Sequence, residues 1–178
     1  YKWNDVRTFE NGMAWVYIFK KDNYEHLWGL LDAKGNYIVE PRYSSFTQFY
    51  NNFSRVTING KYGFINRAGK EITKITYDTV TSFSEGLALV RLKKKWKIID
   101  TTGNVIRDVS GSYAKVGQFS DGLCEVTNAE GLDGYIDASG KEIIPCIYQW
   151  ARSFKKGKAY VEKSVDRYGN TRAGMIDK

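Results

Sequence analysis

Hydrophobic side chains occur along the chain in short runs that are separated by polar residues and glycine. The runs are about four to seven residues long and rich in Val, Ile, Leu, Tyr and Trp, as in residues 87–90 and 96–99. Such runs, with period-two features and turn signals at both ends, are typical of β-strands. No run has the length and spacing of a three-turn amphipathic helix. The pattern therefore predicts an all-β protein with almost no helix.

The runs recur at a spacing of 34 to 40 residues. Each recurrence contains Phe, two polar residues, Gly or Asn, a variable residue, a small residue, another variable residue and Val. The five phenylalanines are Phe9, Phe49, Phe83, Phe119 and Phe154. The aromatic residues six positions before them are Trp3, Tyr43, Tyr77, Tyr113 and Tyr148. Because this offset is kept five times, the sequence predicts a tandem array of about five β-rich repeats of roughly 35 residues.

A second block in each repeat ends in Asp or Asn, and in the first four repeats Gly follows three residues later. The repeated polar residues are Asp32, Asn66, Asp100, Asp137 and Asp177. Asp and Asn hydrogen-bond their own backbone and Gly tolerates positive φ, so this spacing favours a tight turn. Carboxylates repeated in this way could also suggest a metal or acid-base site. The recurrence at one turn favours a structural role.

Period-two alternation predicts which side chains of the strand after Phe face the core. The small residue is expected to point into a crowded layer, together with the Val two positions later. The small residues are Ala14, Ser54, Ala88, Cys124 and Ala159. The residue between them is expected to face outward. These outward positions are Trp15, Arg55, Leu89, Glu125 and Tyr160.

The blocks around Trp28-Gly29, residues 62–72 and residues 83–90 resemble the bacterial WG-repeat family, whose units carry Trp-Gly or Tyr-Gly ahead of an Ile-Asp-x-x-Gly turn. The chain departs from this pattern at Lys97, which replaces the glycine, and at Asp133 and Ala173, which replace the aromatic residue. The resemblance covers almost the whole chain. It implies a protein or ligand interaction module and no common catalytic residue.

A unit of about 35 residues cannot bury its apolar face alone, so neighbouring units must stack and share a core. We expect one array over residues 1–178, either propeller-like or an open β-solenoid. The order of strand, strand, hairpin and strand suits a propeller blade. Because the chain opens at Tyr1 without an initiator Met, we expect a piece of a longer or processed protein. The approximate units are residues 3–42, 43–76, 77–112, 113–147 and 148–178.

Composition narrows the possible chemistry. One histidine, His26, and two cysteines, Cys124 and Cys146, are too few for a usual zinc site or a disulfide scaffold. No phosphate-binding loop or Ser/His/Asp order is present, so we expect no cofactor, no metal and no enzyme activity. His26 lies in an insertion between residues 19 and 27, where we expect a surface residue. At Cys124 the pattern favours a buried, unreactive thiol over a nucleophile or a bridge to Cys146.

The chain has 27 Lys and Arg against 20 Asp and Glu, a formal net charge of +7. Basic residues cluster at residues 93–95 and 155–158, where hairpin loops or strand edges are expected. Solvated loops therefore explain them better than a nucleic-acid footprint, and no nucleic-acid partner is expected. No apolar run approaches the length of a membrane span.

Aromatic residues that interrupt the repeat pattern are the candidate ligand-binding residues: Trp15, Trp150 and Tyr160. Large aromatics that face water are enriched at contact sites and can stack on sugars. The alternative is that a loop or a neighbouring unit covers each of them. The sequence favours a non-catalytic scaffold for protein-protein interaction in a bacterial protein. A carbohydrate or cell-envelope binding module that uses exposed aromatics is the other possibility, and the compartment stays open.

Overall fold

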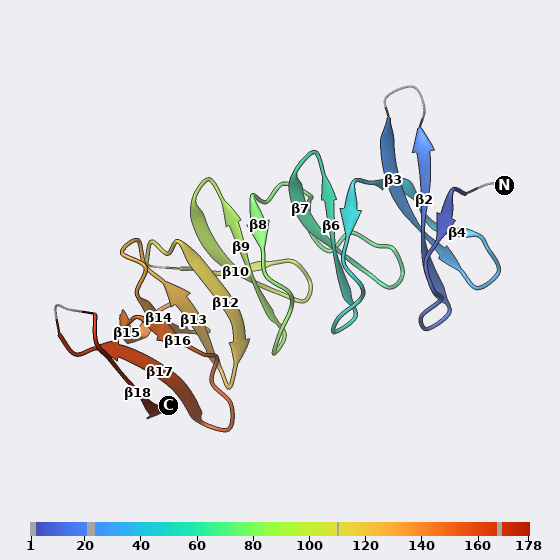
Figure 1. Cartoon of the computed structure of the whole chain (residues 1–178). Helices are drawn as coiled ribbons and strands as arrows, with labels where there is room; N and C mark the ends of the chain where they lie inside the picture. The colour runs from blue at the N-terminus through green and yellow to red at the C-terminus, as the bar shows by residue number, and fades with distance from the viewer. Residues whose placement is uncertain (1–2, 21–23, 110, 167–168) are drawn as a thin grey trace. The chain divides into compact units, whose positions relative to one another are not determined.

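The structure is a computed structural model that describes residues 3–20, 24–109, 111–166 and 169–178. Five antiparallel sheets account for its regular structure, and each sheet is a meander of consecutive strands (Figure 1). No helix occurs within these ranges, so the predicted all-β array is confirmed. Two compact units divide the chain, Tyr1–Asp78 and Thr79–Lys178.

The first unit holds the first and second sheets. Isolated bridges from Tyr62 to Tyr77 and from Ile65 to Glu71 extend the second sheet beyond its last strand. The strands of the first sheet are β1 (Asp5–Val6), β2 (Met13–Lys20), β3 (Glu25–Asp32) and β4 (Tyr37–Tyr43). Those of the second are β5 (Ser45–Phe46), β6 (Phe53–Ile58) and β7 (Lys61–Asn66).

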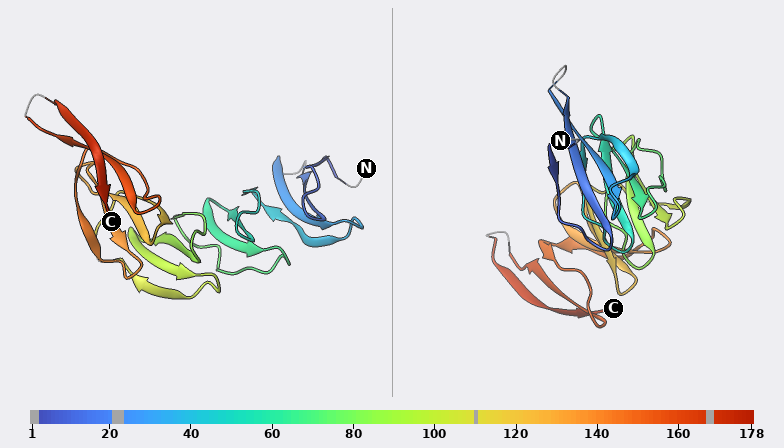
Figure 2. Two further views of the ribbon diagram at one scale, coloured as in Figure 1. Left: turned by 90° about the horizontal axis from the view of Figure 1, so that it is seen from below. Right: turned by 90° about the vertical axis from the view of Figure 1, so that its right-hand side faces the viewer.

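The second unit holds the third, fourth and fifth sheets. The strands of the third sheet are β8 (Thr79–Val80), β9 (Leu87–Leu92), β10 (Lys95–Asp100) and β11 (Val105–Asp108). Those of the fourth are β12 (Lys115–Ser120), β13 (Leu123–Thr127), β14 (Asp133–Asp137) and β15 (Glu142–Tyr148). Those of the fifth are β16 (Trp150–Ala151), β17 (Lys158–Ser164) and β18 (Thr171–Asp177). In the fifth sheet, β17 and β18 form a long hairpin, drawn in red in Figure 2.

Tight turns join the strands, and their backbone explains the repeated polar residues and glycines. After each repeated Phe, two consecutive residues have positive φ, as expected for the type I′ turns that match strand twist. These pairs are Asn11–Gly12, Asn51–Asn52, Glu85–Gly86, Asp121–Gly122 and Lys156–Gly157. Between β9 and β10 the positive-φ residues are Lys93 and Lys94, so this lysine cluster lies on a hairpin turn.

The core lies between successive sheets of each unit. The small residues predicted to face inward are all at most 2% exposed, and the Val two positions after each of them is also buried. Between the third and fourth sheets, Leu89 and Ile98 pack with Phe119 and Val126. Neighbouring sheets of a unit therefore share one hydrophobic core, as expected for a repeat that is too small to form a core alone.

Hydrogen bonds also join successive repeats of the second unit. Trp96 Nε1 donates to the backbone oxygen of Tyr113 at 2.9 Å. Asp133, which departs from the aromatic pattern, accepts from the Ala151 amide of the fifth sheet at 3.0 Å. A carboxylate at this position thus replaces apolar packing with a buried hydrogen bond.

In the second unit, acidic side chains link the turns after Phe from one repeat to the next. The Glu85 carboxylate accepts from the backbone amides of Asp121 at 2.7 Å and Gly122 at 2.9 Å. Asp121 in turn accepts from the Gly157 amide at 2.8 Å. In the fifth repeat this position is occupied by Lys156, which has no acceptor to offer a further turn.

Candidate functional site

Some of the side chains predicted to face solvent are buried in the structure, and others are partly exposed. Trp15 is only 2% exposed and Leu89 is fully buried, so the expectation that both face solvent is wrong. Trp15 stacks on Phe46 of the second sheet, with ring centroids 4.1 Å apart. The prediction failed because the face that was expected to meet solvent packs against the next sheet. Period-two alternation along a strand therefore does not distinguish buried side chains from solvent-exposed ones. Trp15 therefore has no surface at which a ligand could bind.

Trp150 and Tyr160 lie together on the face of the fifth sheet opposite the one that packs on the fourth sheet. Trp150 is 42% exposed and meets the half-buried Tyr160 edge to face at a centroid distance of 5.6 Å. The guanidinium carbon of Arg152 lies 4.7 Å from the centroid of the Trp150 ring, within range of a cation–π interaction. The structure thus brings two of the three candidate residues together and adds Arg152.

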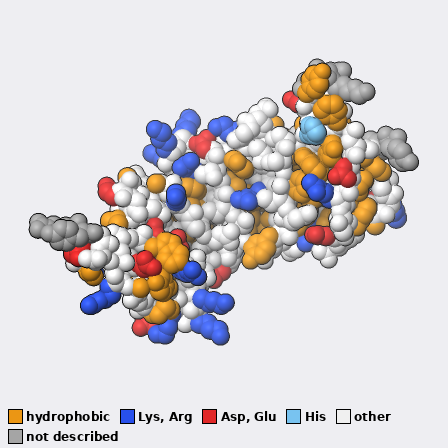
Figure 3. Space-filling view, in the orientation of Figure 1, with side chains coloured by type: hydrophobic (Ala, Val, Ile, Leu, Met, Phe, Trp, Pro, Cys, Tyr) orange, Lys and Arg blue, Asp and Glu red, His pale blue; other side chains and the backbone are white. Residues whose placement is uncertain are grey.

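A shallow hollow of about 350 Å³ is lined by Trp150, Arg152 and Tyr160. The Tyr160 hydroxyl donates to Glu162 Oε1 at 2.8 Å, and this hydrogen bond to a carboxylate raises the pKa of Tyr160. Figure 3 shows hydrophobic side chains gathered over β16 and β17, with Lys and Arg side chains around them. The arrangement offers aromatic surface beside both a cation and a carboxylate, which suits a ligand that has apolar and charged parts.

Arg152 was missed by sequence reasoning, which searched for aromatic exceptions only. The sequence nevertheless contains a pattern that predicts its position. Arg152 stands two positions after Trp150, and period-two alternation places both side chains on one face of the sheet.

Four of the five repeated polar residues accept hydrogen bonds from the backbone of their own turns, as predicted. Asp32 Oδ1 accepts from the amides of Lys34 and Asn36, both at 2.8 Å, and Asn66, Asp100 and Asp137 accept from equivalent amides. Asp177, the fifth, ends β18 and pairs with Lys158 at 2.6 Å. The backbone hydrogen bond from Asn36 lowers the pKa of Asp32 because it stabilises the charged form. No cluster of three or more His, Cys, Asp or Glu side chains suited to a metal ion occurs among the residues that the structure describes.

The cysteines are both free thiols. Burial raises the pKa of Cys124 to about 12 and that of Cys146 to about 11. Neither sulfur is therefore a thiolate at neutral pH, which agrees with the prediction of an unreactive thiol at Cys124.

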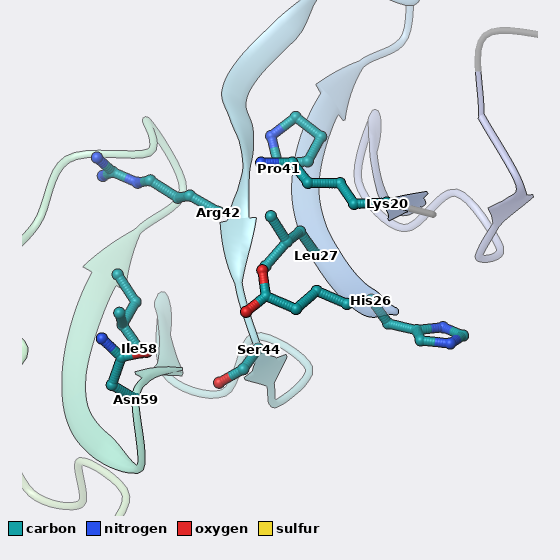
Figure 4. Close-up of a pocket in the computed structure, with 9 residues that line it drawn as sticks. Lys20, His26, Leu27, Pro41, Arg42, Ser44, Ile58 and Asn59 are labelled. Carbon is teal, nitrogen blue, oxygen red and sulfur yellow. The ribbon is translucent and has the colours of Figure 1, made fainter. Parts of the chain in front are cut away.

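His26 lies near the end of the long β2–β3 hairpin, beside a surface groove of about 370 Å³ in the first unit. Figure 4 shows its ring pointing away from the other labelled side chains. Arg42, which also lines the groove, is paired with Glu71 at 2.8 Å. Glu25 and Lys20 also line the groove, but the His26 ring points away from it and the Arg42 guanidinium is already paired, so the groove carries no assigned function.

Comparisons with known proteins agree with the repeat pattern. The family model described as "WG containing repeat" matches residues 28–62, 62–96 and 134–164, which together are more than half of the chain. No curated protein matches the chain.

Among solved structures, the chain is similar to BamB from Moraxella catarrhalis, with 9% identity, a TM-score of 0.49, and coverage of 89% of this chain and 55% of that one. It is similar to the WD40 β-propeller domain of Doa1, with 13% identity, a TM-score of 0.46, and coverage of 97% and 67%. It is also similar to YCF48 bound to D1 peptide, with 10% identity, a TM-score of 0.48, and coverage of 90% of this chain and 60% of that one. The chain thus spans little more than half the length of the BamB and YCF48 chains. Among the described residues, no helix is long and apolar enough to cross a membrane.

Proposed function

The chain belongs to the family of WG-containing repeats, and from this premise we propose that it is a non-catalytic scaffold that binds a protein partner through the exposed face of its fifth sheet. The observation that carries the proposal is the group formed by Trp150, Arg152 and Tyr160. Trp, Tyr and Arg are the residue types most enriched among the side chains that dominate binding energy at protein interfaces.

Arg152 also favours a protein over a sugar. Sugar rings stack on an open aromatic face, whereas the guanidinium of Arg152 already lies against the Trp150 ring. At a protein interface the same stacked pair offers aromatic area and a cation for a partner carboxylate. Carbohydrate binding remains the second candidate function because 42% of Trp150 is still exposed.

The test uses the 178-residue chain as bait for proteins of its source organism, followed by rebinding of each purified candidate. Trp150→Ala removes the central aromatic ring. The matched control is Tyr50→Ala, which removes an aromatic side chain that is 58% exposed on a turn of the first unit. We expect a purified protein to bind wild type and Tyr50→Ala, and to bind Trp150→Ala roughly tenfold or more weakly.

The same variants on a glycan array separate the two candidate functions. A glycan whose binding depends on Trp150 would replace the protein proposal with the carbohydrate one. Binding of every candidate protein and glycan unaltered by Trp150→Ala would overturn the assignment of this face.

A further inference from the structure

Positive charge is concentrated at the end of the β9–β10 hairpin in the third sheet. Five of the seven residues 91–97 are Lys or Arg, and none is Asp or Glu. Figure 3 shows Lys and Arg side chains gathered at this end of the hairpin. The third repeat is flanked by other repeats on both sides in the chain, so this feature does not depend on either end of the sequence.

The turn of this hairpin holds lysines in a conformation that does not suit them. Lys93 and Lys94 have φ values of 51° and 67°. The same two-residue turn of the second repeat is formed by Asn59 and Gly60, with φ values of 50° and 71°. Asn and Gly adopt the left-handed region readily, whereas lysine does so at a cost in stability. Turn geometry therefore does not explain why lysines occupy this turn.

The third sheet also departs from the repeat where Lys97 replaces the glycine. In the first and fourth sheets the fourth strand passes close to Gly29 and Gly134, where an added Cβ would lie 2.7 and 2.6 Å from a backbone oxygen of that strand. Those fourth strands, β4 and β15, are seven residues long. In the third sheet β11 has four residues and ends at Asp108, which pairs with Lys97. The side chain at position 97 thus accompanies a shorter fourth strand.

A hollow of about 310 Å³ lies at this place. Its lining includes Lys94, Lys95 and Lys97, together with Asp108 and Ser112. Lys97 forms a salt bridge with Asp108. The hydrogen bond and charge of Lys97, and then the charge of Lys95, lower the pKa of Asp108. No salt bridge to Lys94 or Lys95 occurs among the residues that the structure describes.

The charge of the hollow indicates its ligand. Three ammonium groups against the one carboxylate of Asp108 leave a net charge of +2, even though Lys97 is already paired. A phosphate monoester carries about −1.5 to −2 charges at neutral pH, which matches this excess, whereas a single carboxylate would leave half of it. Lysine ammonium groups are common donors to phosphate oxygens, and the Ser112 hydroxyl adds another donor. Because the cluster is confined to one hairpin end, it fits a single phosphate group better than a nucleic-acid backbone.

We propose that the hollow beside the β9–β10 turn binds the phosphate group of a phosphate monoester, held by Lys94, Lys95 and Lys97. Both departures of the third repeat then have a common reason, since each places a lysine at the hollow. The hollow belongs to the third sheet and the Trp150 group to the fifth. The inference therefore goes beyond the proposed function and does not rest on it.

The probe is glycerol phosphate, titrated into the 178-residue chain in an isothermal calorimeter at low ionic strength. We expect saturable binding of one equivalent per chain that weakens as salt is added, because the contacts are between charges near the surface. Phosphatidylcholine vesicles that contain phosphatidate present the same group on a lipid. Vesicle binding that glycerol phosphate displaces would support a lipid headgroup as its source, and binding of glycerol phosphate alone would support a soluble monoester.

Lys94→Gly is the decisive variant, because it removes a cation from the hollow and gives the turn the glycine of the second repeat. We expect it to melt at or above the wild-type temperature and to bind glycerol phosphate roughly tenfold more weakly. Lys97→Gly restores the repeated glycine and should weaken binding by a similar factor.

The matched control is Lys156→Asn. It removes the same charge from another lysine with positive φ, in the turn after Phe of the fifth repeat, and gives it the residue that Asn11 supplies in the first repeat. Because position 156 lies outside the lining of the hollow, affinity should stay within about twofold of wild type.

Three outcomes would overturn the inference. The first is the absence of saturable glycerol phosphate binding by wild type. The second is a loss in Lys156→Asn as large as that in Lys94→Gly, which would show an effect of net charge alone. The third is binding of polyglutamate that depends on Lys94 and that glycerol phosphate does not displace, which would assign the lysines to an acidic protein segment.

Discussion

The fourth and fifth sheets are built from the same repeat, yet one is enclosed and the other is open. In the fourth sheet Leu123 and Tyr135 are buried against Ala151 and Phe154 of the next repeat. The equivalent residues of the fifth sheet are Lys158 and Met175, and both are exposed. The difference shows that the repeat pattern sets the strands, while the neighbouring repeat decides which side chains become core.

The contrast extends to the turns. Asp121 of the fourth repeat holds the turn of the fifth, whereas Lys156 of the fifth repeat has a cation at that position. A lysine cannot accept the two backbone amides that Glu85 accepts in the third repeat. The fifth sheet therefore differs from the fourth both at its face and at its turn, and the proposed binding surface lies on that face.

The largest expected effect on stability comes from the face of the fourth sheet that packs on the fifth. Tyr135→Ala removes a fully buried ring whose hydroxyl donates to the Arg152 backbone oxygen at 2.7 Å. It should lower the free energy of unfolding by about 4 kcal/mol in chemical denaturation. Met175→Ala, at the equivalent but 59% exposed position, should change it by less than about 0.5 kcal/mol. Equal losses at the two positions would show that the fifth sheet is covered too.

The edge gives the next largest effect. Gly134→Val places a Cβ 2.6 Å from the Ile144 oxygen and 2.7 Å from the Cys146 nitrogen, so it should cost about 3 kcal/mol of stability or displace β15. Gly174→Val should be neutral or slightly stabilising. Thermal denaturation of the two variants side by side measures the difference, and a similar loss in both would contradict an open edge.

Glu125 should make stability depend on pH. Desolvation, and then repulsion from Asp133, raises its pKa from 4.5 to about 7. Because the folded chain then holds this proton more tightly than the unfolded chain, the free energy of unfolding should fall as the pH rises from about 4.5 to about 7, and not fall further above that.

Glu125→Gln should remove this slope. The change is on the order of 1–2 kcal/mol after allowance for solvent screening at a half-buried group. Denaturation midpoints at several pH values provide the measurement. A slope that persists in Glu125→Gln would assign it to other carboxyl groups.

The smallest effect is expected in the turns. Glu85→Ala loses the bonds from the Asp121 and Gly122 amides and should cost about 1 kcal/mol. Lys156→Ala is the matched control, since its φ of 54° is close to the 52° of Glu85 but its side chain offers no acceptor for the amides of another turn. Its stability should equal that of wild type, and a loss as large as that of Glu85→Ala would disprove the link between turns.

Much of the fold could be predicted because the same physical requirements recur in every repeat. The turn residues follow from local backbone chemistry, as Asp32 and its amide bonds show. The small residues, such as Ala88 and Cys124, were placed in the core correctly because alternation along one strand is a local property.

The site was predicted only in part, because exposure depends on what packs against a strand. Trp15 and Tyr160 occupy the same position in their repeats, but Trp15 is buried against the second sheet whereas Tyr160 is only half-buried. Sequence periodicity cannot distinguish these cases. The open space at Gly174 was equally hidden, since its sequence context matches that of Gly134.

Hydrogen–deuterium exchange tests most directly whether packing against a neighbouring repeat decides how well each strand is enclosed. In the 178-residue chain we expect the amides of β14, whose residues 133–136 are all buried, to be protected, and those of β18, whose residues 171–175 are all exposed, to exchange faster. Equal protection of β14 and β18 would contradict the account.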